Sequence, residues 1–256
     1  MSEKMHARGR AVVLLAMGLA AGTASATIYT DNTGATDHYS DSYADIANVV
    51  ITNDATNLNI TINLNPVAND GVTPTNIQNN NFTRYDIGFQ TGLGGNTGLT
   101  EPFGQSMGIS TGQNYNLESW ANQNAAPSTL GGYSLQHWNG ASWDVVGTSS
   151  TDTVFPTGKS LTVPLASLGL ADGSTFFFDV WTTFGGGNGA YDALFNDSLT
   201  TQPFGTIVPY DSATAAGTRF GTQGTSYTVV IVPEPVSLAT LGAFGLLTLS
   251  RRRSHK

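Results

Sequence analysis

Residues 58–64 alternate strictly, with leucine or isoleucine at every even position and asparagine or threonine at every odd one. A period of two places the apolar side chains on one face, so this segment predicts a β-strand with one buried side. Pro66 ends the pattern shortly afterwards. Residues 47–51 precede it across a turn-rich link, 52–56, and we therefore expect the two segments to form a hairpin.

Similar short segments recur along the chain and are separated by loops rich in glycine and asparagine. Stretches typical of helices are rare. The pattern predicts an all-β fold, an antiparallel β-sandwich of jelly-roll type, over residues 27–231. The further candidate strands are residues 85–89, 107–109, 133–138, 142–146, 160–165, 175–181 and 227–232.

The N-terminal segment has the three parts of a secretory signal. Lys4, Arg8 and Arg10 give a positive start, and residues 11–21 are apolar. Small residues follow at the Ala24-Ser25-Ala26 site. These features predict a signal peptide over residues 1–26, removed after Ala26, and hence export of the protein.

The C-terminal segment, 232–256, combines a Pro233-Glu234-Pro235 hinge, an apolar run over 236–250 and a positive cluster, Arg251-Arg252-Arg253. A helix over the run would be about 22 Å long, short of the roughly 30 Å hydrocarbon core, so it predicts a weak membrane anchor. The alternative is a buried C-terminal helix of a soluble domain.

That order of hinge, short membrane helix and arginine cluster resembles the PEP-CTERM sorting signal of exopolysaccharide-producing bacteria. The resemblance implies that an exosortase reads and cuts the segment. It also implies transient anchoring in the inner membrane, followed by a location at the cell surface or in the extracellular matrix.

Charge limits the partners of the region between the two signals. Residues 27–235 keep three basic residues, Arg84, Lys159 and Arg219, against 17 acidic ones, a net charge of −14. A surface this acidic repels phosphate backbones, so we expect no binding to nucleic acid. Neutral glycans, such as an extracellular polysaccharide, and calcium remain compatible with it.

The strand pattern of residues 45–64, 85–89, 161–165 and 175–180 is similar to DOMON-like and family-9-type carbohydrate-binding β-sandwiches. That resemblance implies binding of sugar or haem on a concave sheet face. The haem variant lacks support, because histidine and methionine partners are not evident at fitting positions.

Tryptophan side chains supply the apolar surface on which sugar rings stack. An Asn-Gly turn separates Trp138 from Trp143, and strand alternation then puts both indoles on one face together with Gln136. This group predicts a glycan platform, with the sandwich core as the alternative location of the same face. We expect Trp120 to be exposed, which makes it a further candidate for glycan binding, and Trp181 to lie in the core.

Catalytic patterns are weak. A G-x-S-x-G match at residues 104–108 lacks the helix that a nucleophile elbow requires. The candidate bases are His38 and His137, and the glutamates Glu101 and Glu118 form no recognisable carboxylate pair. The chain has no cysteine, which removes thiol chemistry. We therefore expect no enzyme activity.

Aspartates in polar loops suggest a possible calcium site, because Ca²⁺ prefers oxygen ligands. Asx turns account for the same residues without a metal. The candidates are Asp31, Asp37, Asp41, Asp192 and Asp197.

The sequence thus predicts an exported, exosortase-processed surface or matrix protein with a non-catalytic carbohydrate-binding sandwich. The alternatives are a structural or adhesive protein of the biofilm matrix without a specific glycan ligand and, third, a hydrolase that acts on polysaccharide.

Overall fold

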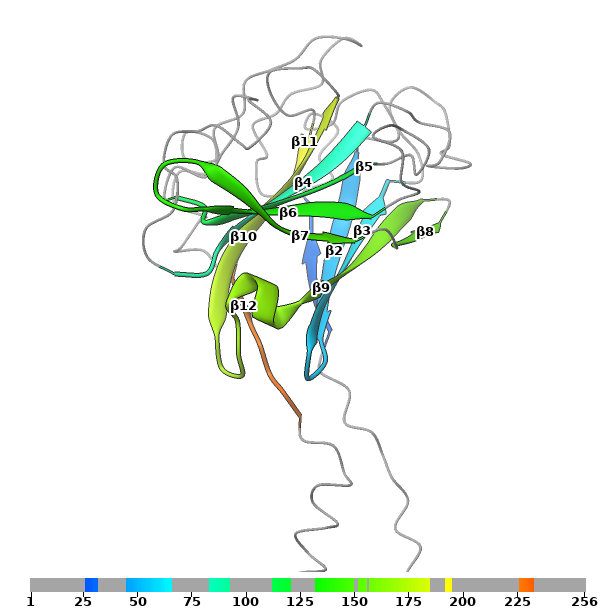
Figure 1. Ribbon diagram of the computed structural model, residues 1–256. Helices are drawn as coiled ribbons and strands as arrows, with labels where there is room; N and C mark the ends of the chain where they lie inside the picture. The colour runs from blue at the N-terminus through cyan, green and yellow to red at the C-terminus, as the bar shows by residue number, and fades with distance from the viewer. Residues whose placement is uncertain are drawn as a thin grey trace, which may run out of the picture. The chain divides into compact units, whose positions relative to one another are not determined.

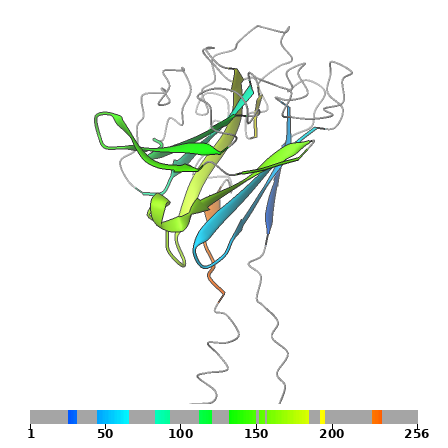
Figure 2. The ribbon, with the colours of Figure 1, turned by 45° about the vertical axis from the view of Figure 1, so that its right-hand side comes forward.

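Two antiparallel β-sheets face each other in the computed structural model (Figures 1 and 2). The structure describes residues 26–31, 45–65, 83–92, 112–120, 132–149, 152–155, 157–184, 192–194 and 226–232. These residues all belong to one unit, Ala24–Val232. The predicted signal peptide up to residue 25 and the sorting segment from residue 233 lie outside the described residues.

The smaller sheet has the strand order β1-β2-β3-β9-β8 and the larger one the order β11-β10-β4-β5-β6-β7, with β12 also paired to β10. In the smaller sheet the strands are β1 Thr27–Thr30, β2 Ile46–Asn53, β3 Asn57–Leu64, β8 Thr153–Phe155 and β9 Gly158–Pro164. In the larger sheet they are β4 Thr83–Gln90, β5 Tyr115–Trp120, β6 Tyr133–Trp138, β7 Trp143–Ser149, β10 Thr175–Phe184, β11 Asp192–Ala193 and β12 Ser226–Thr228.

The predicted hairpin at the start of the fold is confirmed. β2 and β3 pair antiparallel, and their turn is closed by Asp54, whose carboxylate accepts hydrogen bonds from the backbone N–H groups of Thr56 at 2.7 Å and Asn57 at 2.8 Å. The turn is shorter than the predicted link, because β2 continues to Asn53. An aspartate at this position stabilises the turn by bonding to the backbone two and three residues later.

The hydrophobic core fills the space between the sheets. The even-numbered residues of β3 face it and are 0 to 3% exposed, as their alternation predicts. Tyr29 of the smaller sheet meets Phe178 of the larger one edge to face, with ring centroids 4.9 Å apart. The larger sheet contributes Tyr85, Ile87, Phe89, Leu117, Leu135, Phe176, Phe178 and Val180.

Most predicted strands are present, so the all-β class is confirmed. The candidate strand at residues 107–109 lies outside the described residues. The prediction of a strand over residues 227–232 is wrong for residues 229–232, since β12 ends at Thr228. Helical structure in the described ranges is the 3₁₀ turn η2, Leu165–Leu168. No helix in these ranges has the length and apolar character needed to cross a bilayer.

Side chains hold the segment after β12 against the body. Asn53 donates to the carbonyl of Val230 at 2.9 Å and accepts from its N–H at 3.2 Å and from the hydroxyl of Tyr227 at 2.8 Å. The N–H of Ile231 donates to Asp172 at 2.7 Å. The backbone adds two bonds, from the N–H of Val229 to the carbonyl of Ser174 at 2.8 Å and from the N–H of Gly173 to the carbonyl of Val229 at 2.9 Å.

Gly158, at the turn between β8 and β9, is packed too tightly for a side chain. A Cβ atom there would overlap the carbonyl oxygen of Ile62 and the ring of Phe155. We expect Gly158→Ala to lower the free energy of unfolding by about 1–3 kcal/mol, measured by urea denaturation. Gly147→Ala is the control, because its Cβ would lie an ordinary 3.7 Å from Leu135. Equal effects of the two substitutions would contradict this prediction.

Candidate functional site

All four tryptophans lie on one face of the larger sheet, the face opposite the hydrophobic core. The strand register pairs Arg84 with Trp120, Asp86 with Trp181, and Trp138 with Trp143. These residues alternate along their strands with core residues, so their side chains point away from the smaller sheet. We call this surface the tryptophan face; it comprises Arg84, Asp86, Asn116, Glu118, Trp120, Gln136, Trp138, Trp143, Asp179, Trp181 and Thr183.

Trp138 and Trp143 form the accessible end of the face. Both side chains are half-buried, and their ring centroids are 5.5 Å apart at an interplanar angle of 60°. The turn between them is held by Asn139, whose side-chain oxygen accepts from the N–H groups of Ala141 and Ser142 at 2.9 Å each. The prediction that the two indoles share a face is confirmed. The alternative that this face is the sandwich core is wrong, because β6 sends Tyr133 and Leu135 into the core instead.

Asn116 and Gln136 lie opposite each other on β5 and β6, next to this indole pair. Asn116 is 1% exposed and Gln136 is 6% exposed. Among the residues that the structure describes, the amide oxygen and nitrogen of Asn116 and the indole nitrogen of Trp143 are buried without a hydrogen-bond partner. An unpaired buried polar group costs a fold about 1–3 kcal/mol.

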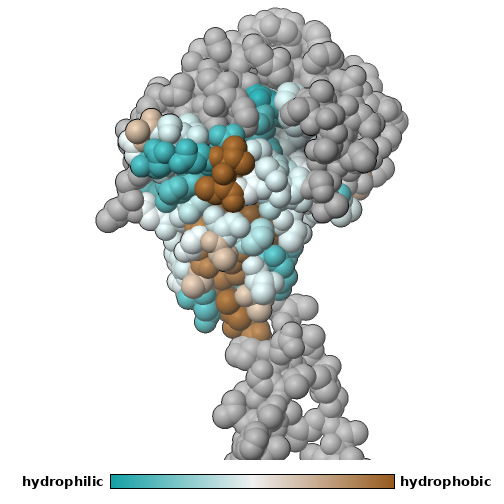
Figure 3. Space-filling view, in the orientation of Figure 1, coloured by the Kyte–Doolittle hydropathy of each residue, from teal (hydrophilic) through white to brown (hydrophobic). Residues whose placement is uncertain are grey.

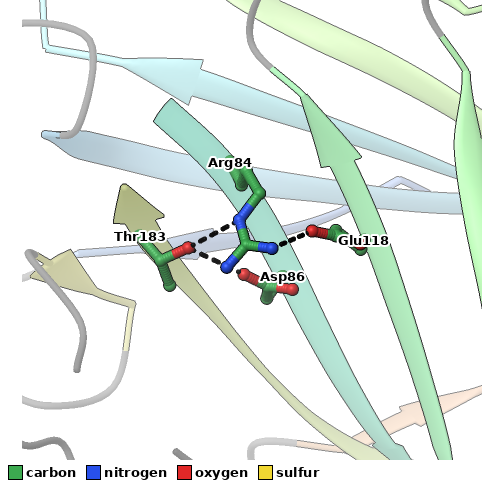
Figure 4. A network of polar contacts seen from close by, with 4 residues as sticks. All are labelled: Arg84, Asp86, Glu118 and Thr183. Carbon is green, nitrogen blue, oxygen red and sulfur yellow. Dashed lines mark hydrogen bonds and ion pairs between the residues drawn. The ribbon is translucent and has the colours of Figure 1, made fainter. Parts of the chain in front are cut away.

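A network of polar contacts crosses β10, β4 and β5 (Figure 4). Arg84 forms a buried ion pair with Glu118 and donates from Nε to the hydroxyl of Thr183 at 3.2 Å. That hydroxyl donates to Asp86 at 3.3 Å. The guanidinium carbon of Arg84 also lies 5.1 Å from the ring centroid of Trp120, within the range of a cation–π contact. The network fixes the orientation of this tryptophan.

A second buried ion pair lies in the smaller sheet, near its β8 edge. Lys159 of β9 pairs with Asp152 and donates to the backbone carbonyl of Trp120, so it links the two sheets. Burial lowers the pKa of Lys159 to about 7, whereas the adjacent carboxylate favours the charged form. Arg84 and Lys159 are the basic residues of the described ranges, and both are committed to these pairs.

The prediction that Trp181 is buried is confirmed, although its side chain lies on the tryptophan face and not between the two sheets. The prediction for Trp120 is wrong. Trp120 is half-buried beneath Arg84 and not an exposed loop residue, because it ends β5.

Sequence reasoning also missed Asn116, Asp86 and Asp179 as members of this face. The alternation of Tyr115, Asn116 and Leu117 was the signal that could have placed β5.

The catalytic candidates remain scattered. His137 packs against Tyr115, with ring centroids 4.6 Å apart, and Glu118 is engaged by Arg84. His38, Glu101 and the residues of the G-x-S-x-G match lie outside the described residues.

The structure describes two of the five calcium candidates, and both are buried. The carboxylate of Asp192 accepts a hydrogen bond from the backbone N–H of Ile46 at 2.6 Å, and Asp31 follows β1. Asp37, Asp41 and Asp197 lie outside the described residues. Within the part of the chain that the structure describes, no group of three or more His, Cys, Asp or Glu residues has the arrangement of a metal site.

Comparison of the chain with protein-family models, with curated proteins and with solved structures gives no match.

Proposed function

We propose that this protein is an exported, non-catalytic carbohydrate-binding module. The observation that carries the proposal is the gathering of all four tryptophans on one sheet face, opposite the core and beside the amides of Asn116 and Gln136. Sugars have apolar ring faces and polar edges, so a site for them combines aromatic rings with hydrogen-bonding amides. Trp138 and Trp143 offer two adjacent rings that solvent partly reaches, and Trp120 is half-buried as well.

The terminal segments support an export route and a final location for the protein. We infer that the signal peptide directs export and that an exosortase processes the segment around Pro233-Glu234-Pro235 after a transient stay in the inner membrane. The mature protein then resides at the cell surface or in the exopolysaccharide of a biofilm matrix.

A structural or adhesive role is the second candidate, and an apolar patch favours it. Figure 3 shows apolar side chains beside strongly hydrophilic ones in the region where Figure 1 labels β6 and β7. Val145 and Val146 of β7, the last strand in the order of the larger sheet, are 63% and 46% exposed. An edge strand with exposed valines is suited to pairing with another chain.

Affinity electrophoresis through gels that contain different polysaccharides tests the proposal. We expect one polysaccharide to retard the protein, and Trp138→Ala or Trp143→Ala to weaken the affinity about tenfold or more, since each removes a stacking surface. Thr162→Ala is the control, because Thr162 lies on an exposed polar row of the smaller sheet, hydrogen-bonded to Asn59. A protein that no polysaccharide retards would favour the structural role.

A further inference from the structure

We propose that the protein forms a homodimer in which two copies pack together through the outer face of the smaller sheet. This face consists of the side chains that alternate with core residues along the strands (Figures 1 and 2). We call it the neutral face; it comprises the even-numbered residues 28–30, 48–52 and 160–164 and the odd-numbered residues 57–63. The observation that carries the proposal is that none of these residues, all within the described part of the chain, is charged.

The lack of charge on this face contrasts with the acidity of the protein. Residues 27–235 carry 17 acidic residues against three basic ones, so two copies repel each other wherever their acidic surfaces meet. The neutral face instead carries asparagine, threonine and serine together with Ile28, Val50 and Pro164. Asp54 lies beyond the face, in the turn at its end, and its carboxylate is hydrogen-bonded within that turn. Two copies can therefore meet on the neutral face without opposing like charges.

The polar side chains of the neutral face bond to one another across the strands. Three pairs are hydrogen-bonded: Asn63 with Asn48 at 2.7 Å, Thr61 with Ser160 at 2.7 Å and Thr162 with Asn59 at 2.9 Å. Burying a polar group is costly chiefly when nothing replaces its hydrogen bonds to water. The cross-strand bonds also fix the side chains before association, which reduces the entropy lost on binding. A second copy can thus cover this face at a lower cost than a surface of unpaired polar groups.

The area of the neutral face is large enough for a specific contact. Strands about 4.8 Å apart that rise about 3.3 Å per residue give the five-stranded sheet a face of roughly 500 Å². Two copies would together bury about 1,000 Å², the lower limit for a specific interface. Ile28, which is 63% exposed, adds apolar surface to it. An interface of this size predicts a reversible dimer of moderate affinity.

The dimer would present two tryptophan faces on opposite sides. The neutral face and the tryptophan face are the outer surfaces of the two sheets, with the hydrophobic core between them. Under the proposed function, one dimer would therefore bind two polysaccharide chains and cross-link them, or bind one chain twice with higher avidity. This consequence rests on the proposed function, whereas the dimer itself does not.

Sedimentation equilibrium of the purified protein tests the proposal. We expect a monomer–dimer equilibrium with a Kd on the order of 10 µM, and a lower Kd at high salt, because salt screens the repulsion between acidic copies. Thr61→Glu puts a charge on β3, the central strand of the smaller sheet, and should raise the Kd at least about tenfold. Thr148→Glu is the matched control; Thr148 is exposed on β7 of the larger sheet, and this variant should dimerise like the unmodified protein.

Asn59→Asp tests the same face without changing the shape of the side chain. Its carboxylate can still accept the hydrogen bond from Thr162, so this variant serves even if Thr61→Glu does not fold. We expect it to weaken the dimer as well. A protein that stays monomeric at all concentrations, an association that persists in both variants, or one that salt weakens would overturn the inference. A dimer with these properties that binds no polysaccharide would support the inference while the proposed function fails.

Discussion

Arg84→Met should lower the free energy of unfolding by about 3–5 kcal/mol, because it leaves a buried carboxylate without its partner. The side chains of Arg84 and Glu118 are each 5% exposed, so water cannot replace the lost ion pair. The substitution also removes the donor that reaches Thr183 at 3.2 Å. The effect is measured by urea denaturation, with tryptophan fluorescence as the signal. Trp120 contributes to that signal, and the guanidinium of Arg84 lies over its ring.

Glu118→Gln in the Arg84→Met background is the matched control. Neutralising the orphaned carboxylate should recover part of the lost stability, because the cost of the single variant comes from an uncompensated charge. Under the proposed function, glycan affinity should fall as well, since Trp120 loses the contact that orients it. An Arg84→Met protein that unfolds at the same urea concentration as the unmodified protein would show that the ion pair contributes nothing to the fold.

The fold follows from the sequence where a strand has one apolar face. β3 is the clearest case: its alternation predicts both the strand and the residues that it buries. β5 was not predicted, because Tyr115 and Leu117 are its apolar positions in a stretch that is otherwise polar. On its other face Asn116 and Glu118 are polar but buried, and polar residues of this kind resemble a loop in composition.

The site could be predicted only in part, for a physical reason. Trp138 and Trp143 are joined by a short turn, so local geometry alone puts them on one face. Trp181 belongs to a run that is apolar on both faces: Phe176, Phe178 and Val180 enter the core, while Trp181 points the other way. Periodicity cannot assign such a strand. The pairing of Arg84 with Glu118 joins residues 34 positions apart and depends on the sheet order, which local pattern does not encode.

The free energy of unfolding should rise as the pH increases from about 7 to 10, by at most about 1.4 kcal/mol per pH unit. Desolvation by burial lowers the pKa of Lys159 from its ordinary value of 10.5 to about 7. Between these two values the unfolded chain holds a proton that the folded protein lacks. Raising the pH therefore favours the folded state, and the paired carboxylate of Asp152 reduces the slope without changing its sign.

Above pH 10 the same measurement should turn downward. Desolvation, together with the nearby Tyr227, raises the pKa of Tyr29 from 10.0 to about 12. In that interval the folded protein keeps a phenolic proton that the unfolded chain loses, so stability present below pH 10 is lost as the pH approaches 12. Urea denaturation across this pH range should therefore show a maximum near pH 10, and Tyr29→Phe should make the decline less steep.

The double variant Lys159→Met/Asp152→Asn isolates the rising limb. It replaces the buried ion pair by uncharged side chains of similar size, a change that is often neutral or stabilising in proteins. Either single variant would instead leave a buried charge without its partner. We expect the double variant to be at least as stable as the unmodified protein near pH 7 and to show a flat profile up to about pH 10. A slope that persists in this variant would assign the pH dependence to other groups. A flat profile would show that the protonation of Lys159 causes the rise in stability with pH. Because Lys159 also bonds to the carbonyl of Trp120, the contact between the two sheets at Trp120 would then depend on pH.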